Sequence, residues 1–232
     1  PQGRIIDWNE NPEMVVIGAA TVGAAAQLRS VFETIGKGNA PIFRMDRLSA
    51  EISKLALNCY LTMKISYANS IGDLALRAGA NPEKILQAIG GDSRIGGKYL
   101  SYGFGYGGPC FPRDNKALVH YARTVGASVP LNAAADTVNS EHLDFQLNHF
   151  IETVGKETTV VFDGGSDEFN FNEGKFGSVA YKAGTVILEE SQQLFFAAKL
   201  AQSGYRVEIK DTAVVINEVE KTYGNLFHYE VQ

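Results

Sequence analysis

The pattern of hydrophobic and polar positions divides the chain into three parts, and the first part alternates strand and helix signals. Residues 14–18 form a short apolar run closed by glycine, which is typical of a buried strand. Residues 21–35 carry apolar side chains at helical spacing and end at Gly36, and residues 41–45 form a second strand candidate. The pattern predicts one strand–helix–strand step of a parallel sheet.

The second part, residues 46–155, has the pattern of a helical region. Asp46 can cap a helix that ends near Arg77, and its length of about 32 residues far exceeds the mean of ~11–12 for globular helices, so we expect a spine on which other helices pack. One apolar stripe runs along it, formed by Leu48, Ile52, Leu55, Cys59 and Met63. Shorter helices are expected over 82–90, where Asn81 is the cap, and over 114–124 and 131–154.

The third part, residues 156–232, returns to an α/β pattern. Strands are predicted at 158–162, 205–210 and 227–231, and helices at 190–203 and 215–223. Residues 164–177 are polar and rich in glycine, so we expect a loop or an insertion there.

Composition narrows the class of protein. The 232 residues are 45% hydrophobic and 20% charged, which is enough for one large core or two modest ones. The net charge of −5, without a basic stripe, argues against a nucleic-acid partner. No apolar run approaches the roughly 18 residues of a membrane helix, and residues 1–4 do not read as the start of a signal peptide. Two cysteines, Cys59 and Cys110, predict free thiols in a reducing compartment, so we expect a cytoplasmic protein.

Cys110 is the strongest candidate for chemistry. It ends a loop that begins at Gly90 and holds eight glycines, and loops of this length are often functional. The glycines let the backbone approach a ligand, and Asp114 is expected to cap the next helix, whose N-terminus would favour a thiolate. A lone cysteine is more often a small buried hydrophobe, but the glycines together with Pro109 and Pro112 favour a nucleophile here.

Lys54 and Asn58 are four residues apart on the predicted long helix, so they share one face that differs from the apolar stripe. A lysine and an asparagine that point together can stabilise a developing oxyanion. Taken alone, the pair is more simply read as part of a solvated helix face.

Two other patterns predict no site. Residues 18–23 imitate the G-x-G-x-x-G fingerprint of a dinucleotide-binding turn, but Ala20 stands at the middle glycine and no acidic residue follows at the ribose position. We interpret them as an ordinary strand-to-helix turn. The histidines form no ligand-like cluster, so we expect surface or interface residues and no metal site. They are His120, His142, His149 and His228.

Ser-Lys-Leu-Ala-Leu-Asn at 53–58, Asp-Ser-Arg-Ile-Gly at 92–96 and Gly-Tyr-Gly-Gly-Pro-Cys-Phe-Pro-Arg-Asp at 105–114 resemble, in order and spacing, the UDP-glucose/GDP-mannose dehydrogenase family. The residues at 181–185 and 190–191 resemble the family's nucleotide-binding motif with less specificity. The resemblance covers most of the chain. It implies an NAD-dependent nucleotide-sugar 6-dehydrogenase, similar to UDP-glucose 6-dehydrogenase, that oxidises the 6-hydroxyl to a carboxylate with two NAD+.

The resemblance also implies roles for individual residues. Cys110 would attack the aldehyde left by a first hydride transfer, and the thiohemiacetal would become a thioester that water hydrolyses. Lys54 and Asn58 would stabilise the oxyanion, and Asp114 would act with Lys54 on proton transfer or on the hydrolytic water. Arg94 would reach a nucleotide across a dimer interface. The implied substrate-binding residues are Tyr60, Arg94, Tyr99, Gly105, Gly107, Gly108 and Lys182.

The domain organisation follows from the same resemblance. We expect residues 1–45 to be the C-terminal remnant of an NAD-binding Rossmann domain, and 46–155 to be a helical domain that dimerises through the long helix. Residues 156–232 would be part of a Rossmann-like α/β domain that binds the nucleotide sugar. Most of the NAD domain would precede Pro1, so no cofactor-binding residue is assigned, and the last strand and helix would follow Gln232.

An alternative function stays open. After Thr185, where many family members have Asp-Asp-x-Arg, this chain has Val-Ile-Leu-Glu at 186–189, so the base of the nucleotide is not assigned. Without the usual crevice for NAD, we expect no turnover from this chain alone and a dimer that binds no NAD+. The alternative is a non-catalytic module for dimerisation and nucleotide-sugar binding. The presence of Lys54, Asn58, Cys110 and Asp114 together favours the enzyme.

Overall fold

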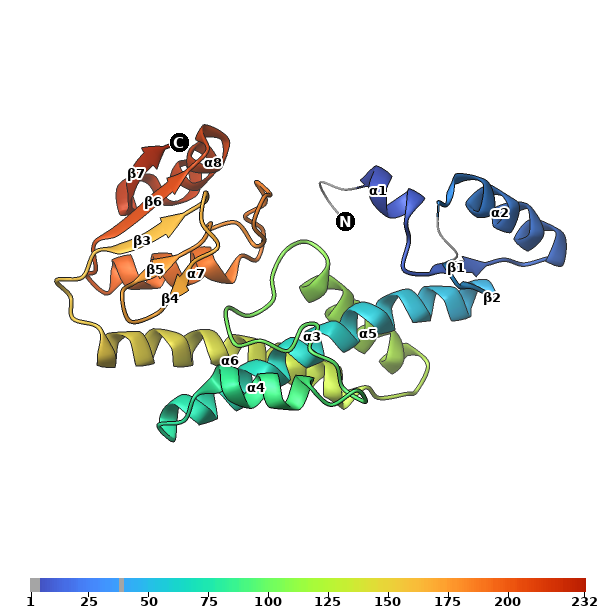
Figure 1. The fold of residues 1–232 in the computed structure, drawn as a ribbon, viewed down its shortest axis with the longest axis horizontal. Coiled ribbons are helices and arrows are strands. Elements are labelled where there is room, and N and C mark those ends of the chain that lie inside the picture. Colours follow the sequence, from blue (N-terminus) through green and yellow to red (C-terminus); the bar gives the residue numbers. More distant parts are fainter. Residues whose placement is uncertain (1–4, 38–39) are drawn as a thin grey trace. The chain divides into compact units, whose positions relative to one another are not determined.

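A computed structural model describes residues 5–37 and 40–232, and the chain forms two compact units that meet between Leu57 and Asn58 (Figure 1). Just over half of the chain is helical, and both units combine helices with parallel strands. The predicted mixed α/β class is therefore confirmed, while the three-domain division stays a prediction.

The first unit begins with the strand–helix–strand step that the sequence predicts. Strands β1 (Val15–Gly18) and β2 (Ile42–Met45) pair in parallel on either side of helix α2 (Val22–Ile35) in the chain. The Thr21 hydroxyl caps α2 by accepting from the Ala24 backbone N–H. Helix α1 (Ile5–Glu10) was not predicted, because six residues are too few to show a helical period.

Helix α3 (Arg47–Arg77) is the predicted spine, and the boundary between the two units falls inside it. Asp46 precedes it as expected and accepts a hydrogen bond from the Ser49 backbone N–H at 2.9 Å. The apolar stripe is buried only in its later part: Cys59 is buried, whereas Leu48 and Ile52 are 51% and 38% exposed.

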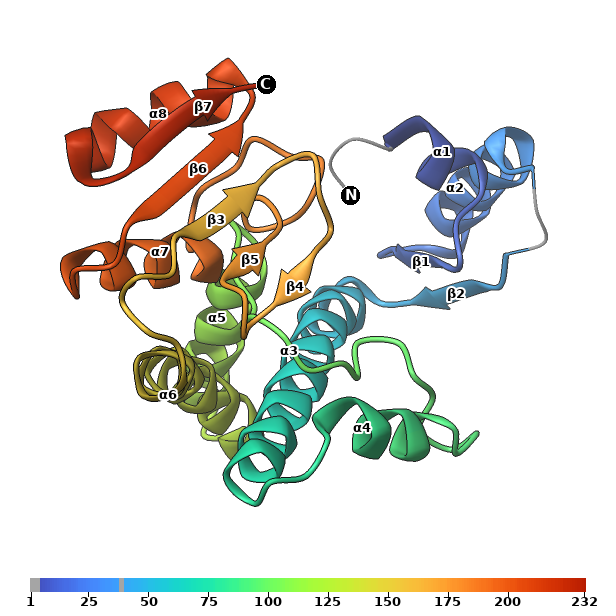
Figure 2. The ribbon, with the colours of Figure 1, turned by 60° about the vertical axis from the view of Figure 1, so that its left-hand side comes forward.

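Three further helices of the second unit surround the later turns of α3. Helix α4 (Pro82–Gly90) is capped by Asn81 as predicted, and α5 (Phe111–Thr124) packs against α6 (Pro130–Thr153). The Ser66 hydroxyl of α3 donates to the Ala135 carbonyl of α6 at 2.9 Å. Figure 2 shows α6 running beside α3 and α5.

A five-stranded sheet forms the rest of the second unit, in the order β4-β5-β3-β6-β7, and only β4 is antiparallel to its neighbour. The strands are β3 (Val160–Asp163), β4 (Phe169–Asn170), β5 (Lys175–Phe176), β6 (Val207–Asp211) and β7 (His228–Val231). Helices α7 (Gln192–Gln202) and α8 (Ala213–Tyr223) both pack on β6, and a 3₁₀ turn (Gly224–Leu226) leads into β7. The largest hydrophobic core lies between these strands and α6, α7 and α8.

The segment 164–177 corrects one expectation. It was predicted as a polar loop or insertion, but it contains β4 and β5 and adds aromatic rings to the core. Phe176 is 1% exposed and lies 5.1–6.3 Å, between ring centroids, from six other phenylalanines. The polar residues around these rings mask the apolar signal in the sequence.

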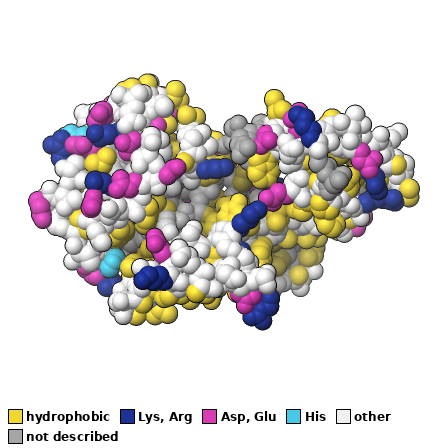
Figure 3. All heavy atoms as spheres, in the orientation of Figure 1, with side chains coloured by type: hydrophobic (Ala, Val, Ile, Leu, Met, Phe, Trp, Pro, Cys, Tyr) yellow, Lys and Arg dark blue, Asp and Glu magenta, His cyan; other side chains and the backbone are white. Residues whose placement is uncertain are grey.

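Acidic and basic side chains are interspersed on the face drawn in Figure 3. Within the described residues, no helix is both long and apolar enough to cross a membrane. The same residues contain no group of three or more His, Cys, Asp or Glu side chains placed to hold a metal ion.

Candidate active site

Cys110 occupies the N-cap position of α5, and its thiol is exposed. Its carbonyl oxygen accepts a hydrogen bond from the Asp114 backbone N–H at 2.8 Å, which closes the first turn of the helix. The expectation that Asp114 caps α5 is therefore wrong, because Asp114 lies inside that turn. Cys110 nevertheless lies at the N-terminus of this helix, as the sequence predicts.

Asp114 is buried beside this thiol and held by two helices. Its carboxylate is 5% exposed and accepts from the Asn58 side-chain amide of α3 at 2.7 Å. The Arg113 guanidinium lies 3.5 Å from the same carboxylate and 4.0 Å from the Cys110 sulfur. The predicted carboxylate and carboxamide thus meet, and the guanidinium of Arg113, which was not predicted, lies near both the carboxylate and the thiol.

Lys54 lies one turn before Asn58 on the continuous helix α3, so the two share a helix face as predicted. Lys54 itself belongs to the first unit. Tyr60, two residues after Asn58, is 56% exposed.

Gly107 and Gly108 are required by the protein's own packing. A Cβ at Gly107 would lie 2.1 Å from the Glu190 carbonyl oxygen, and one at Gly108 would lie 2.5 Å from the Tyr181 ring. Gly108 also has a φ of +78° and donates its N–H to the Glu189 carbonyl at 3.0 Å. The sequence suggested that these glycines make room for a ligand, but the segment 181–190 fills the space where their side chains would be.

The peptide of Tyr106, between Gly105 and Gly107, is held by Asn139 of α6. The Asn139 side chain accepts from the Tyr106 N–H at 2.8 Å and donates to the Tyr106 carbonyl at 2.9 Å. A Cβ at Gly105 would lie 2.3 Å from the Asn139 oxygen. One side chain therefore satisfies both polar groups of a buried peptide and also requires the glycine that precedes it.

The Tyr106 side chain extends this support to the residue next to Asp114. Its hydroxyl donates to Asp136 and accepts from the Asn115 amide, whose oxygen accepts from the Thr62 hydroxyl. Burial, and then the hydrogen bond to Asp136, raises the pKa of Tyr106 well above its usual range. Buried polar groups that are all paired fix a single arrangement, so this network holds α3, α5 and α6 in register below the thiol.

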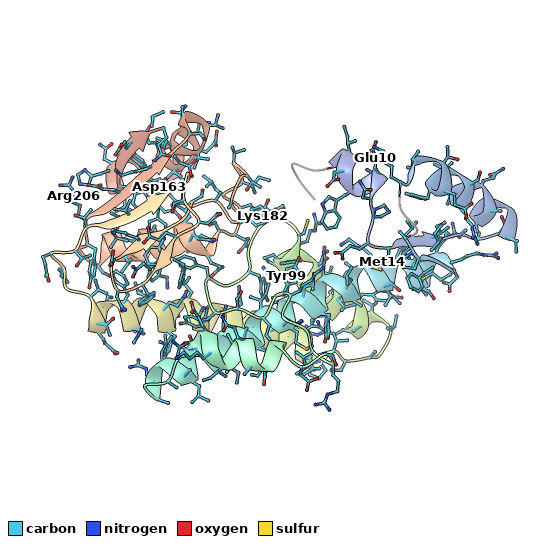
Figure 4. The ribbon with its side chains drawn as sticks, in the orientation of Figure 1. Glu10, Met14, Tyr99, Asp163, Lys182 and Arg206 are labelled. Atoms are coloured by element: carbon cyan, nitrogen blue, oxygen red, sulfur yellow. The ribbon has the colours of Figure 1, made fainter. Side chains whose placement is uncertain are left out.

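The ring of Tyr181, from the third part of the chain, lies against Gly108. Burial, followed by the charge of Cys110, raises the pKa of Tyr181. The next residue, Lys182, is exposed on the loop between β5 and α7 (Figure 4).

Arg94 and Tyr99 are both exposed on the loop that precedes α5. Arg94 forms an ion pair with Asp92, and Tyr99 has a φ of 61°. Tyr99 is labelled in Figure 4. The structure leaves these two predicted substrate-binding side chains, like that of Lys182, at the surface rather than in the core.

A cavity of ≈ 450 Å³ opens beside the glycine turn. Gly108, Pro109 and Pro112 form one side of it, and Glu189 and Glu190 contribute from the segment after Tyr181. The first turns of α5 supply basic side chains: Arg113, Lys116 and His120. The cavity therefore adjoins the turn that carries Cys110 and has charges of both signs in its walls.

The turn between β1 and α2 does not fit a dinucleotide. The Thr21 hydroxyl already accepts an N–H group at the start of α2, and a Cβ at Gly18 would lie 2.6 Å from the Ala50 side chain. Gly18 therefore packs against α3 rather than leaving room for a pyrophosphate. This agrees with the interpretation of residues 18–23 as an ordinary turn.

Two residues of α6 that support the site were missed. Asn139 was not singled out, and His142 was expected at the surface or an interface, whereas it is 1% exposed and hydrogen-bonded on both ring nitrogens. The sequence pattern that could have revealed them is a row of polar residues, spaced by three or four positions along a predicted helix. These residues are Asp136, Asn139, His142 and Gln146.

Comparison with known proteins supports the motifs. Residues 48–141 match the UDP-glucose/GDP-mannose dehydrogenase family, central domain. The chain is 30% identical over 210 residues to UDP-glucose 6-dehydrogenase from Pseudomonas aeruginosa, covering 90% of this chain and 44% of that protein. It is 27% identical to GDP-mannose 6-dehydrogenase from Azotobacter vinelandii, covering 97% of this chain and 47% of the relative.

A solved structure shows the same likeness in three dimensions. The UDP-glucose dehydrogenase from Pyrobaculum islandicum superposes with a TM-score of 0.80 at 28% identity, over 97% of this chain and 49% of that one. The chain spans about half the length of the relatives that it matches, or slightly less.

Proposed function

Because the chain is homologous to the UDP-glucose/GDP-mannose dehydrogenase family in its central and C-terminal portions, we propose that it serves the NAD-dependent oxidation of a nucleotide sugar at C6, with Cys110 as the covalent nucleophile. The observation that carries the proposal is the exposed thiol at the N-terminus of α5 beside the buried carboxylate of Asp114 and the amide of Asn58. A helix N-terminus and a nearby cation favour the nucleophilic form of a thiol, and the Arg113 guanidinium lies 4.0 Å from the Cys110 sulfur.

The first step assigned to these residues is addition. The Cys110 thiolate forms a bond to the aldehyde carbon C6, and the carbonyl electron pair moves to oxygen to give a thiohemiacetal oxyanion. An amide has two N–H donors, and Asn58 gives one to Asp114, so the other is available to the oxyanion. Lys54, one turn earlier on α3, adds a positive charge on the same helix face.

The second step is hydrolysis of the thioester that follows oxidation. Water adds to the acyl carbon, Asp114 accepts one of its protons, and the carbon–sulfur bond breaks to return the Cys110 thiolate and release the acid. The oxidation between these steps needs a nicotinamide dinucleotide as hydride acceptor. The described residues do not provide its phosphate-binding turn, so we assign that step to no residue of this chain.

We assign substrate binding and assembly on the family resemblance. Gly105, Gly107 and Gly108 shape the turn that carries Cys110 beside the sugar, and the substrate contacts come from Tyr60, Arg94, Tyr99 and Lys182. A second copy of the chain pairs along α3, whose exposed apolar residues include Leu57, Tyr60, Tyr67 and Leu74. Two free thiols are consistent with a cytoplasmic enzyme.

Replacement of the nucleophile tests the proposal. In the full-length protein, a UDP-sugar should drive NADH formation, and Cys110→Ala should lower kcat by at least roughly a thousandfold, because the covalent intermediate cannot form. Cys59→Ala is the matched control, since that thiol is 1% exposed, and it should retain turnover. Full turnover in Cys110→Ala would refute the covalent mechanism.

The second candidate is a non-catalytic dimerisation and nucleotide-sugar-binding module, and the absence of a dinucleotide turn in the described part of the first unit favours it. Calorimetry separates the two functions. A protein that binds a UDP-sugar but neither binds NAD+ nor forms a covalent adduct with a sugar aldehyde at Cys110 would be such a module.

A further inference from the structure

His142 is buried between α3 and the loop that leads to Cys110. Its Nδ1 lies 2.9 and 2.8 Å from the two carboxylate oxygens of Asp73 on α3. Its Nε2 lies 2.8 Å from the carbonyl oxygen of Gly103 in the loop. The ring therefore connects Asp73 of α3 directly to the main chain of the glycine-rich segment.

The partners determine how many protons the pair holds. A carbonyl oxygen only accepts, so Nε2 must carry a proton and donate to Gly103. The Asp73–Nδ1 contact needs a second proton, and the Tyr102 hydroxyl also donates to the same carboxyl group at 3.0 Å. The pair therefore holds two protons, one on Nε2 and one between Nδ1 and Asp73.

Gly103 is held on both of its polar groups. Its carbonyl also accepts from the Gln146 amide at 3.1 Å, and its N–H donates to the Asn69 side chain of α3 at 3.2 Å. Three residues further on, Asn139 holds the Tyr106 peptide. Hydrogen bonds therefore fix the backbone at two residues, Gly103 and Tyr106, before it reaches Cys110.

We propose that His142, paired with Asp73, is a positioning residue for Cys110, because it fixes the Gly103 carbonyl and hence the start of the segment 103–110. The proposal rests on the proposed function in one respect, namely that Cys110 is the nucleophile. His142 does not touch the thiol and acts through the backbone. Removal of either partner leaves polar groups of the other without their hydrogen bonds, and the loop has to rearrange to satisfy them.

Two measurements that need no turnover test this role in the whole protein. In His142→Gln, the amides of residues 103–108 should exchange hydrogen roughly tenfold faster or more, because the Gly103 anchor is weakened. The rate of Cys110 alkylation by iodoacetamide should change by about threefold or more, since the thiol's surroundings are no longer fixed. Amides of β3 and β6 should keep their protection.

His149→Gln is the control variant, because His149 lies on the same helix and its ring is stacked between Phe145 and Phe171. It should leave both the loop exchange and the alkylation rate unchanged. Equal loosening of the loop by both variants, or unchanged loop exchange in His142→Gln, would overturn the proposal. If His142→Gln does not fold, Asp73→Asn provides the same comparison, with the same two outcomes.

Nitrogen-15 NMR tests the hydrogen bond from Nε2 to Gly103. The unmodified protein should show a slowly exchanging Nε2–H that disappears in His142→Gln, and a ring without that N–H would overturn the assigned bond. If the loop responds as stated but Cys110→Ala retains turnover, the proposed function fails while the structural role of His142 stands.

Discussion

The segments 90–110 and 164–177 are both glycine-bearing excursions from regular structure, yet they are stabilised in opposite ways. The first is held by buried polar side chains, among them Asn139 and His142, that bond to its main chain. The second is held by phenylalanine rings that pack into the sheet core, such as Phe176. Only the first leads to a reactive side chain.

The difference follows from the directionality of the two interactions. A hydrogen bond requires a narrow distance and angle, so it locates individual backbone atoms. Apolar burial is not directional, so it stabilises a segment without determining the position of each peptide. Phe104 joins the two systems, because it belongs to the first segment and its ring lies 5.4 Å from Phe169 of the second.

The largest expected loss of stability comes from the segment 164–177, which is held by phenylalanine rings. Phe176→Ala removes a fully buried ring, so we expect the free energy of unfolding in urea to fall by about 3–5 kcal/mol. Under conditions where the variant is folded, the rate of Cys110 alkylation should stay unchanged. A loss below about 1 kcal/mol would show that the cluster contributes little to stability.

Asn139→Ala should lower the stability of the protein and also change the reactivity of Cys110. It leaves the buried N–H and carbonyl of Tyr106 without partners, and we expect a loss of about 2–4 kcal/mol in unfolding free energy. The Cys110 alkylation rate should change as well, unlike in Phe176→Ala. Asn148→Ala, at an exposed position of the same helix, is the control. An unchanged alkylation rate in a folded Asn139→Ala protein would show that the hydrogen bonds to segment 90–110 do not position Cys110, so the two segments would not differ in this respect.

Tyr106→Phe tests the network with almost no change of shape. Loss of the hydroxyl should lower the unfolding free energy by about 1–2 kcal/mol at neutral pH. The folded-state pKa of Tyr106 lies above the usual value of 10.0, so its stabilising contribution is present below about pH 10 and is lost as the pH rises further. Denaturant titrations should show a shallower alkaline decline in Tyr106→Phe, and an identical decline would contradict the assignment.

Phe169→Ala should have the smallest effect. Phe169 is 39% exposed, so truncation should lower the unfolding free energy by only about 1 kcal/mol. Because its ring contacts Phe104, hydrogen exchange at residue 104 should rise slightly while exchange at Tyr106 stays constant. A change at Tyr106 as large as in Asn139→Ala would mean that aromatic packing also positions the turn.

Much of the secondary structure was predictable, because its signals are local. Apolar period and caps such as Asp46 and Asn81 located the helices to within a few residues. The turn around Cys110 was recognised from its glycines and prolines, and its place at the start of a helix was correct although Asp114 was given the wrong role. Lys54 and Asn58 were placed on one face because helix geometry alone decides that.

The sequence by itself therefore determined most of the elements, the candidate nucleophile Cys110 and the motifs that relate this chain to a dehydrogenase family. Only the tertiary structure decided that Asn58 and Asp114 meet, that Asn139 holds the Tyr106 peptide and that His142 is a buried partner of Asp73. The physical reason is the distance along the sequence over which each kind of interaction acts. A helix or a cap depends on residues within one or two turns, whereas a buried hydrogen bond joins residues tens of positions apart and leaves no period in the sequence.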